Sequence, residues 1–252
     1  MHLTLKIDFK KQRISGNSIL TLDMAYQGGE SVLLNANQQK IHNITDEATG
    51  EILKHVNEST HIKVILPKPS SKQMKIRISY TIIAGLVWLK PSQTVGKKRP
   101  FVFSMGWREG VFHCPLFPCQ HTNLVKTTFS AHITGPAWST ALMSATHNIP
   151  PRPFTNVKSE RLKLTPFLQT LPISSYLVAL AAGALQSEKL GTRTRVWAES
   201  EILETAAKDF SETENMLNKA EAICGPYVWK NYDILVLPPA FAYGGMENPC
   251  MT

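Results

Sequence analysis

The residues with the clearest chemical potential lie in the stretch YGGMEN, at positions 243–248. Extended backbone at a glycine pair can pair edge to edge with a bound peptide, because no side chain blocks its approach. A neighbouring carboxylate can hold an ammonium group through charge-assisted hydrogen bonds. The stretch therefore predicts a site for the free N-terminus of a peptide, and the alternative is a simple turn, since glycine pairs are common in turns. The candidate substrate-binding residues are Tyr243, Gly244, Gly245, Met246, Glu247 and Asn248.

No recognisable catalytic motif accompanies this stretch. The sequence has no His-Glu-x-x-His, no Gly-x-Ser-x-Gly elbow, no phosphate loop and no dinucleotide fingerprint. Two thiols and two imidazoles do lie close together, at His113, Cys114, Cys119 and His121. Their spacing matches no tight zinc pattern, so we interpret them as partly buried turn residues, with a metal site as the alternative. The sequence thus predicts no catalytic and no metal-ligating residue within this chain.

The basic charge balance does not by itself define a partner. The 252 residues carry a net charge of +8, but their Lys and Arg residues are scattered rather than gathered in one block. The densest cluster, Lys97-Lys98-Arg99, is interpreted as a solvated loop, with a polyanion site as the alternative. We therefore expect no nucleic-acid partner.

The sequence also indicates where the chain resides. Its first residues alternate like a strand and lack the continuous apolar stretch of a signal peptide. The longest apolar run, Tyr176 to Leu185, is far shorter than the roughly 20 residues of a membrane helix. Four cysteines are too few and too unevenly spread for a disulfide scaffold. We expect a soluble chain, without membrane insertion, in the reducing cytoplasm.

Residues 1–186 have the period-two pattern of an antiparallel β domain. Leu3, Leu5, Ile7 and Phe9 share one face of the first predicted strand. Turn signals rich in Gly, Pro, Asn and Ser separate the others. The further strand candidates are residues 18–24, 32–34, 61–66, 75–83, 100–104, 125–133, 161–167 and 176–184.

Residues 187–252 have a different, mixed character. A strand at residues 194–198 precedes a helical pattern over 201–223. Ser211 with Glu214 fits a capping box, which predicts a helix break near Phe210 and a new start at Ser211. Gly225 with the following proline predicts the stop, and residues 233–237 read as a buried strand. This unit is too short to close a core of its own, so it is expected to pack on the first and looks like the start of a cut domain.

At the YGGMEN stretch the sequence resembles the gluzincin aminopeptidases, whose Gly-x-Met-Glu-Asn signature is specific. The resemblance extends along nearly the whole chain, and it is closest to a branch that combines aminopeptidase with epoxide hydrolase activity. The supporting stretches are residues 88–104, 117–122, 210–229 and 227–252.

The resemblance implies a fold, and it implies different roles for this chain and for the rest of a full-length enzyme. It implies a mainly β N-terminal domain with saddle-like antiparallel sheets, over residues 1–186, and then the truncated α+β start of a thermolysin-like catalytic domain from Ser187. It also implies that Glu247 binds the α-amino group of a peptide substrate and that residues 243–246 line the peptide channel. Zinc is expected in a full-length enzyme, but in the family its ligands follow Met-Glu-Asn. The chain alone is therefore predicted to ligate no zinc and to be inactive.

Two departures from the family pattern limit what is carried over. Met105 to Phe112 replaces a shorter, glutamine-containing stretch that helps to form the substrate pocket, so no pocket role is assigned to it. Ala242 stands where relatives have proline, which would fix the backbone angle there. The leading hypothesis is the N-terminal part of a zinc aminopeptidase, in which this chain recognises the substrate amine. The alternative is a truncated, non-catalytic isoform that acts as an interaction module, and polyanion binding is a third option.

Overall fold

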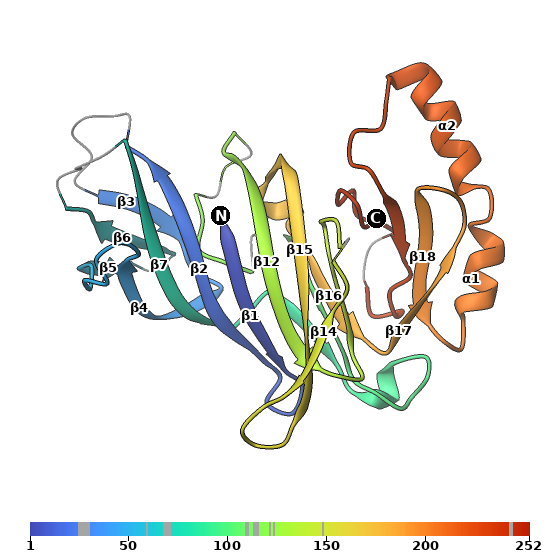
Figure 1. Ribbon diagram of the computed structural model, residues 1–252, viewed down its shortest axis with the longest axis horizontal. Coiled ribbons are helices and arrows are strands. Elements are labelled where there is room, and N and C mark those ends of the chain that lie inside the picture. The colour runs from blue at the N-terminus through green and yellow to red at the C-terminus, as the bar shows by residue number, and fades with distance from the viewer. Residues whose placement is uncertain are drawn as a thin grey trace.

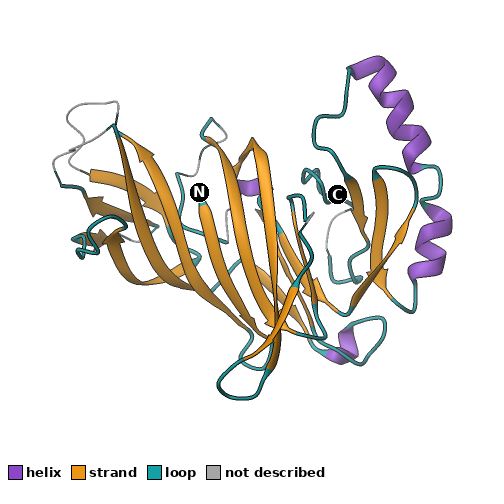
Figure 2. Ribbon diagram, in the orientation of Figure 1, coloured by secondary structure: helices purple, strands orange, loops and turns teal. Residues whose placement is uncertain are grey.

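The computed structural model describes most of the chain, and strands dominate it. Figure 2 shows that the helices gather mainly at one end of the molecule. The mainly β character with antiparallel sheets is as predicted. The described residues are 1–24, 31–58, 60–67, 72–108, 111–112, 116–120, 122, 124–147, 149–241 and 244–252.

A seven-stranded sheet forms the largest layer (Figure 1). All neighbouring strands in it are antiparallel except β1 and β12, which run parallel. In spatial order its strands are β14 (Arg152–Thr155), β15 (Arg161–Ser174), β12 (Lys126–Pro136), β1 (His2–Asp8), β2 (Arg13–Asp23), β7 (Gln73–Ile82) and β4 (Gln39–Asp46).

The alternation of side chains gives this sheet one core face. Leu3, Leu5 and Ile7 of β1 are at most 2% exposed, while the residues between them point to the other face, as the period-two pattern predicts. The same alternation on β7 and β12 adds Ile76, Ile78, Tyr80, Phe129, Ala131 and Ile133 to the main core. Burial of this face is the dominant stabilising contribution to the sheet.

Three smaller sheets complete the first part of the chain. The four-stranded sheet consists of β13 (Thr140–Met143), β16 (Leu180–Gly183), β9 (Phe101–Ser104) and β8 (Leu86–Leu89). The three-stranded sheet consists of β3 (Ser31–Asn35), β6 (His61–Ile65) and β5 (His55–Asn57). The two-stranded pair is β10 (Trp107–Arg108) with β11 (Val111–Phe112). Short 3-10 helices lie at Pro91–Gln93 (η1) and Ser175–Leu177 (η2).

The last part of the chain is a small α/β unit. It contains β17 (Leu185–Lys189), β18 (Thr194–Glu199), α1 (Leu203–Asp209), α2 (Thr213–Cys224) and β19 (Tyr232–Leu235). β18 pairs antiparallel with β17 and parallel with β19. Val196 and Ala198 of β18 pack against Ala206 and Ala207 of α1, so the helices cover one face of this sheet (Figure 1). β17 runs across residues 186 and 187, and the domain division predicted there remains a prediction.

Three local predictions differ from the structure. The strand predicted over residues 233–237 ends at Leu235, and Asp233 is its one buried residue. Residues 176–184 are not one strand: Ser175 accepts a hydrogen bond from Val178 N–H at 3.2 Å, which forms η2 and delays β16 to Leu180. The helix break near Phe210 is confirmed, but Ser211 does not cap α2, which begins at Thr213. The capping box does not form because the Glu214 carboxylate binds elsewhere in the fold.

That carboxylate helps to hold α2, which has no fully buried residue. Glu214 accepts hydrogen bonds from the hydroxyls of Thr192 and Thr194 at 3.0 and 2.8 Å, and from Arg193 N–H at 3.0 Å. The Arg193 guanidinium also donates to Glu214 and binds both oxygens of Glu221, each at 2.8 Å. A polar network rather than an apolar face thus attaches the helix to the sheet.

This network predicts a loss of stability in acid. Burial raises the pKa of Glu214, but the hydrogen bonds from Arg193 and Thr194 outweigh it and lower that pKa to about 2. The Arg193 guanidinium, followed by Tyr227 N–H, lowers the pKa of Glu221 to about 2. Because both folded-state values lie below the ordinary value of 4.5, the stabilisation is present above that pH and is lost as pH falls towards 2. Urea unfolding at a series of pH values measures this.

A charge-removing variant isolates the contribution of Glu214. Glu214→Gln is expected to lower the free energy of unfolding at pH 7 by roughly 1 to 2 kcal/mol, a range reduced for partial exposure. It is also expected to flatten the acid-side slope. The matched control is Glu204→Gln, at an exposed position of α1. If Glu214→Gln and Glu204→Gln have the same stability at pH 7, the network does not hold the helix.

The small unit packs on the first part of the chain through a shared apolar cluster. Leu235, Leu237 and Met251 contact a cluster that includes Phe101 and Phe103 of β9. Gly183 permits the close approach of β16 to that cluster, because a Cβ there would collide with the Phe101 ring. This shared core supplies the packing that the sequence indicated the second unit could not provide alone.

Candidate peptide-binding site

The glycine-rich stretch is part of the connection that follows β19. Phe241 N–H donates to Pro238 O at 3.0 Å, which turns the chain after the strand. The last residues then return beside β19: Thr252 N–H donates to Asp233 O, and Leu235 N–H donates to Thr252 O, both at 2.8 Å. Residues 244–248 therefore belong to a connection that leaves β19 and returns to its edge.

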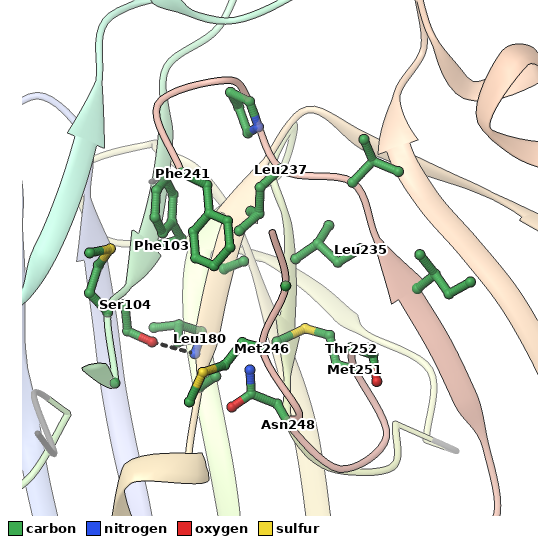
Figure 3. Close-up of a pocket in the computed structure, with 18 of the residues that line it drawn as sticks. Phe103, Ser104, Leu180, Leu235, Leu237, Phe241, Met246, Asn248, Met251 and Thr252 are labelled. Atoms are coloured by element: carbon green, nitrogen blue, oxygen red, sulfur yellow. Dashed lines mark hydrogen bonds between the residues drawn. The ribbon is translucent and has the colours of Figure 1, made fainter. Parts of the chain in front are cut away.

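This loop forms one side of an apolar cavity of about 440 Å³. Phe103 of β9 and Phe241 contact each other edge to face, with ring centroids 5.9 Å apart (Figure 3). Leu180 N–H donates to Ser104 Oγ at 2.9 Å, which joins β16 to the end of β9 at the cavity. Met246 and Asn248 lie next to each other in Figure 3 and line the same cavity. Such a cavity suits an apolar side chain near a few polar groups.

Gly244 and Gly245 also line the cavity, and the structure gives no internal reason for their being glycine. Neither has a positive φ, so neither uses the left-handed conformation that glycine turns exploit. A Cβ added at either position would meet no atom within 4 Å. The absent side chains therefore leave open space beside exposed main chain, which disfavours the simple turn.

Glu247 is exposed and does not itself line the cavity, although both of its neighbours do. Its Oε1 accepts a hydrogen bond from the Tyr176 hydroxyl in η2 at 3.3 Å. Burial, and then the negative charge of Glu247, raise the pKa of Tyr176, so the tyrosine remains a neutral donor. A carboxylate that accepts one long neutral hydrogen bond from the described residues keeps acceptor positions for an ammonium group.

Other predicted site residues are placed in different ways. Tyr243 and Ala242 lie outside the described residues, as do His113, Cys114 and His121 of the Cys/His cluster. Cys119 is buried and pairs with Asn35 in an isolated β-bridge. Within the described ranges, no group of three or more His, Cys, Asp or Glu side chains could hold a metal ion.

The structure adds two features that the sequence did not reveal. Met105 and Gly106, at the start of the stretch that departs from the family pattern, line the cavity. Tyr176, which the sequence placed in an apolar strand, contacts Glu247. These contacts join parts of the chain far apart in sequence, so no local pattern could have indicated them.

The comparison of sequences with known proteins shows the family of the chain. Residues 1–177 match the peptidase M1 N-terminal domain. The chain belongs to the peptidase M1 family. Leukotriene A-4 hydrolase of Xenopus laevis is 36% identical over 262 residues, which cover 100% of this chain and 42% of that M1 relative. Aminopeptidase B of Rattus norvegicus is 40% identical over 196 residues, covering 75% of this chain and 28% of its own length.

Solved structures of relatives show the same fold. Native yeast LTA4 hydrolase matches 99% of this M1 chain with a TM-score of 0.85 and 28% sequence identity. The yeast LTA4 hydrolase structure in complex with Bestatin gives the same values. In both comparisons the match covers 39% of the yeast chain, so this chain spans less than half the length of these relatives. The family predicted from the Gly-x-Met-Glu-Asn signature is confirmed.

In the part of the chain that the structure describes, no helix is both long enough and apolar enough to cross a membrane.

Proposed function

We propose that this chain recognises the free N-terminus of a peptide. The observation that carries the proposal is the pairing of an exposed, under-occupied carboxylate at Glu247 with an open glycine pair on the wall of an apolar cavity. The carboxylate would accept hydrogen bonds from the ammonium group. The open main chain would lie along the peptide backbone, as in strand addition.

The cavity would receive the side chain of the first peptide residue. Its wall of Phe103, Phe241 and Leu237 supports an apolar side chain, and its volume of about 440 Å³ leaves room for a large one. Asn248 supplies an amide that can donate to or accept from the peptide backbone. Recognition would therefore depend on the charged amine and on an apolar first residue.

Peptide cleavage is a separate part of the proposal. We propose that a protein joining this chain to the remaining length of its M1 relatives is a zinc aminopeptidase resembling leukotriene A(4) hydrolase. The described residues offer no set of metal ligands, so they do not fit a zinc site and no hydrolytic step is assigned to them. No described residue carries an argument for epoxide hydrolysis, which remains an implication of the family resemblance.

Peptide titration tests the recognition step directly. Ala-Ala-Ala with a free amine is expected to bind the 252-residue chain at least about tenfold more tightly than N-acetyl-Ala-Ala-Ala. The reason is that acetylation removes the positive charge that would bind the Glu247 carboxylate. Ala-Ala-Ala-amide, altered only at its other end, is the control and is expected to bind like the parent peptide. Equal affinity for the free and acetylated peptides would overturn the proposal.

The predicted inactivity has its own test. Hydrolysis of an aminoacyl anilide by the purified chain is expected to stay at background with and without added zinc, because the described residues offer no ligand set that would hold a metal-activated water. Turnover that a chelator abolishes, and that Glu247→Ala also abolishes, would refute this.

A further inference from the structure

A second cavity, of about 410 Å³, lies at the edge of the small sheet where β17 ends and β18 and β19 begin. It is lined by residues from the end of β17, the β17–β18 turn, β18, and the segment that leads into β19, with His147 contributed by the first part of the chain. It shares no lining residue with the peptide cavity. Four of its lining residues are cationic, Lys189, Arg193, Arg195 and Lys230.

Two of these cations face each other across neighbouring strands. Lys189 of β17 and Arg195 of β18 are direct partners in the antiparallel register. Like charges at directly opposed positions destabilise a β-sheet. An anion bound between the two side chains would offset this repulsion.

The hydrogen bonds of Arg193 and Arg195 show which of the two guanidinium groups could still pair with an anion. Arg193 makes four side-chain hydrogen bonds, to Glu214, Asn218 and both oxygens of Glu221, so its charge is already compensated. Arg195 donates to Ser187 Oγ at 2.8 Å and lies 5.7 Å from the Trp197 ring centroid. That hydrogen bond uses one of its five N–H donors, and among the described residues no carboxylate lies within ion-pairing distance of Arg195.

The ammonium groups of Lys189 and Lys230 could also pair with an anion. Among the described residues, neither Lys189 nor Lys230 has a carboxylate within ion-pairing distance. Lys230 is held in the left-handed backbone region with φ of 71°, which is uncommon for a residue with a side chain. This conformation is strained, and Lys230 lines the cavity.

One carboxylate, Asp233, also lines the cavity. It is 5% exposed and accepts a hydrogen bond from Trp197 Nε1 at 2.8 Å, and its Oδ2 is 4.0 Å from His147 Nε2. Burial raises the pKa of Asp233, although the Trp197 hydrogen bond, His147 and the charge of Arg195 oppose that effect. Asp233 therefore offsets part of the charge of Arg195, but one carboxylate does not balance the charges of Lys189, Arg195 and Lys230 together.

We infer that this cavity binds a small multivalent oxyanion, of the phosphate or diphosphate class, between Lys189, Arg195 and Lys230. The guanidinium fork of Arg195 matches two oxygens of such a group, and each lysine adds a point charge. The ligand would neutralise the opposed pair of β17 and β18. It would also bind at the junction between the small unit and the first part of the chain, where His147 lies.

Calorimetric titration of the 252-residue chain with inorganic diphosphate tests the inference, at constant ionic strength set with sodium chloride. Saturable one-to-one binding is expected, tighter than that of inorganic phosphate. Lys189→Gln and Lys230→Gln are each expected to weaken binding by at least about tenfold, because each removes a charge-assisted contact. Lys189→Arg should retain binding, and Lys219→Gln on exposed α2 is the control with the same charge change.

Thermal unfolding is a second test, in which the expected effect of Lys189→Gln on the melting temperature depends on whether diphosphate is present. Without diphosphate, Lys189→Gln is expected to raise the melting temperature, because it removes repulsion from Arg195; with diphosphate it is expected to lose the ligand-induced rise. ADP in place of inorganic diphosphate separates the sources, since tighter binding of ADP indicates a phosphate carried on an organic molecule. Binding that Lys189→Gln and Lys230→Gln leave unchanged, or a shift that sodium chloride reproduces, would overturn the inference.

Discussion

Glu247→Gln is expected to weaken binding of free-amine Ala-Ala-Ala by about 10- to 100-fold, the range for loss of a hydrogen bond to a charged group. The glutamine keeps the size of the side chain and can still accept a hydrogen bond from Tyr176, so the loop should keep its shape. Only the negative charge that attracts the ammonium group is removed. Calorimetry on the variant and the parent chain, with free and acetylated peptide, gives the comparison.

Two companion variants sharpen that experiment. Tyr176→Phe removes the hydrogen bond that Glu247 accepts from Tyr176, so it is expected to preserve or slightly strengthen amine binding. Glu204→Gln makes the same charge change on α1 and is expected to have no effect. The proposed role of Glu247 fails if Glu247→Gln binds the free and acetylated peptides with the affinities of the parent chain.

Phe103→Ala is expected to lower the free energy of unfolding by about 3 to 5 kcal/mol, the usual cost of truncating a buried phenylalanine. Phe103 is 2% exposed, and its ring packs against Phe101 and Phe241 with centroid separations of 6.4 and 5.9 Å. It belongs to the cluster that joins the small unit to the four-stranded sheet. Its loss should therefore loosen both the junction and the peptide cavity.

Urea unfolding measures this loss as a change in the free energy of unfolding. Phe154→Ala is the matched control, because Phe154 on the edge strand β14 is 42% exposed, and about 1 kcal/mol or less is expected there. If Phe103→Ala were no more destabilising than Phe154→Ala, the apolar cluster would not be what unites the two parts of the chain.

The sequence predicted those elements whose pattern is local and strong. The alternation of Leu3, Leu5 and Ile7 identified β1 and its buried face, and Gly225 marked the end of α2, where its φ is 88°. The run from residue 176 to 184 misled because a short apolar run alone does not distinguish a strand from a turn followed by a strand. The cap at Ser211 failed because tertiary hydrogen bonds to Arg193 and Thr194 took the Glu214 carboxylate.

Some residues of the candidate site could likewise be predicted from the sequence, and others could not. Met246, Glu247 and Asn248 could be identified from a contiguous motif, and the structure places two of them on one cavity. Tyr176 and Met105 could not, because their proximity depends on how η2 and the end of β9 meet the loop after β19. The opposition of Lys189 and Arg195 likewise depends on the strand register, which the sequence did not specify.

A crystal structure of the 252-residue chain with Ala-Ala-Ala bound is the most direct test of amine recognition. The peptide ammonium nitrogen is expected at about 3 Å from a carboxylate oxygen of Glu247. The first side chain is expected in the cavity bounded by Phe103, Phe241 and Met246. A peptide whose ammonium group lies beyond hydrogen-bonding reach of Glu247 would contradict amine recognition by this residue.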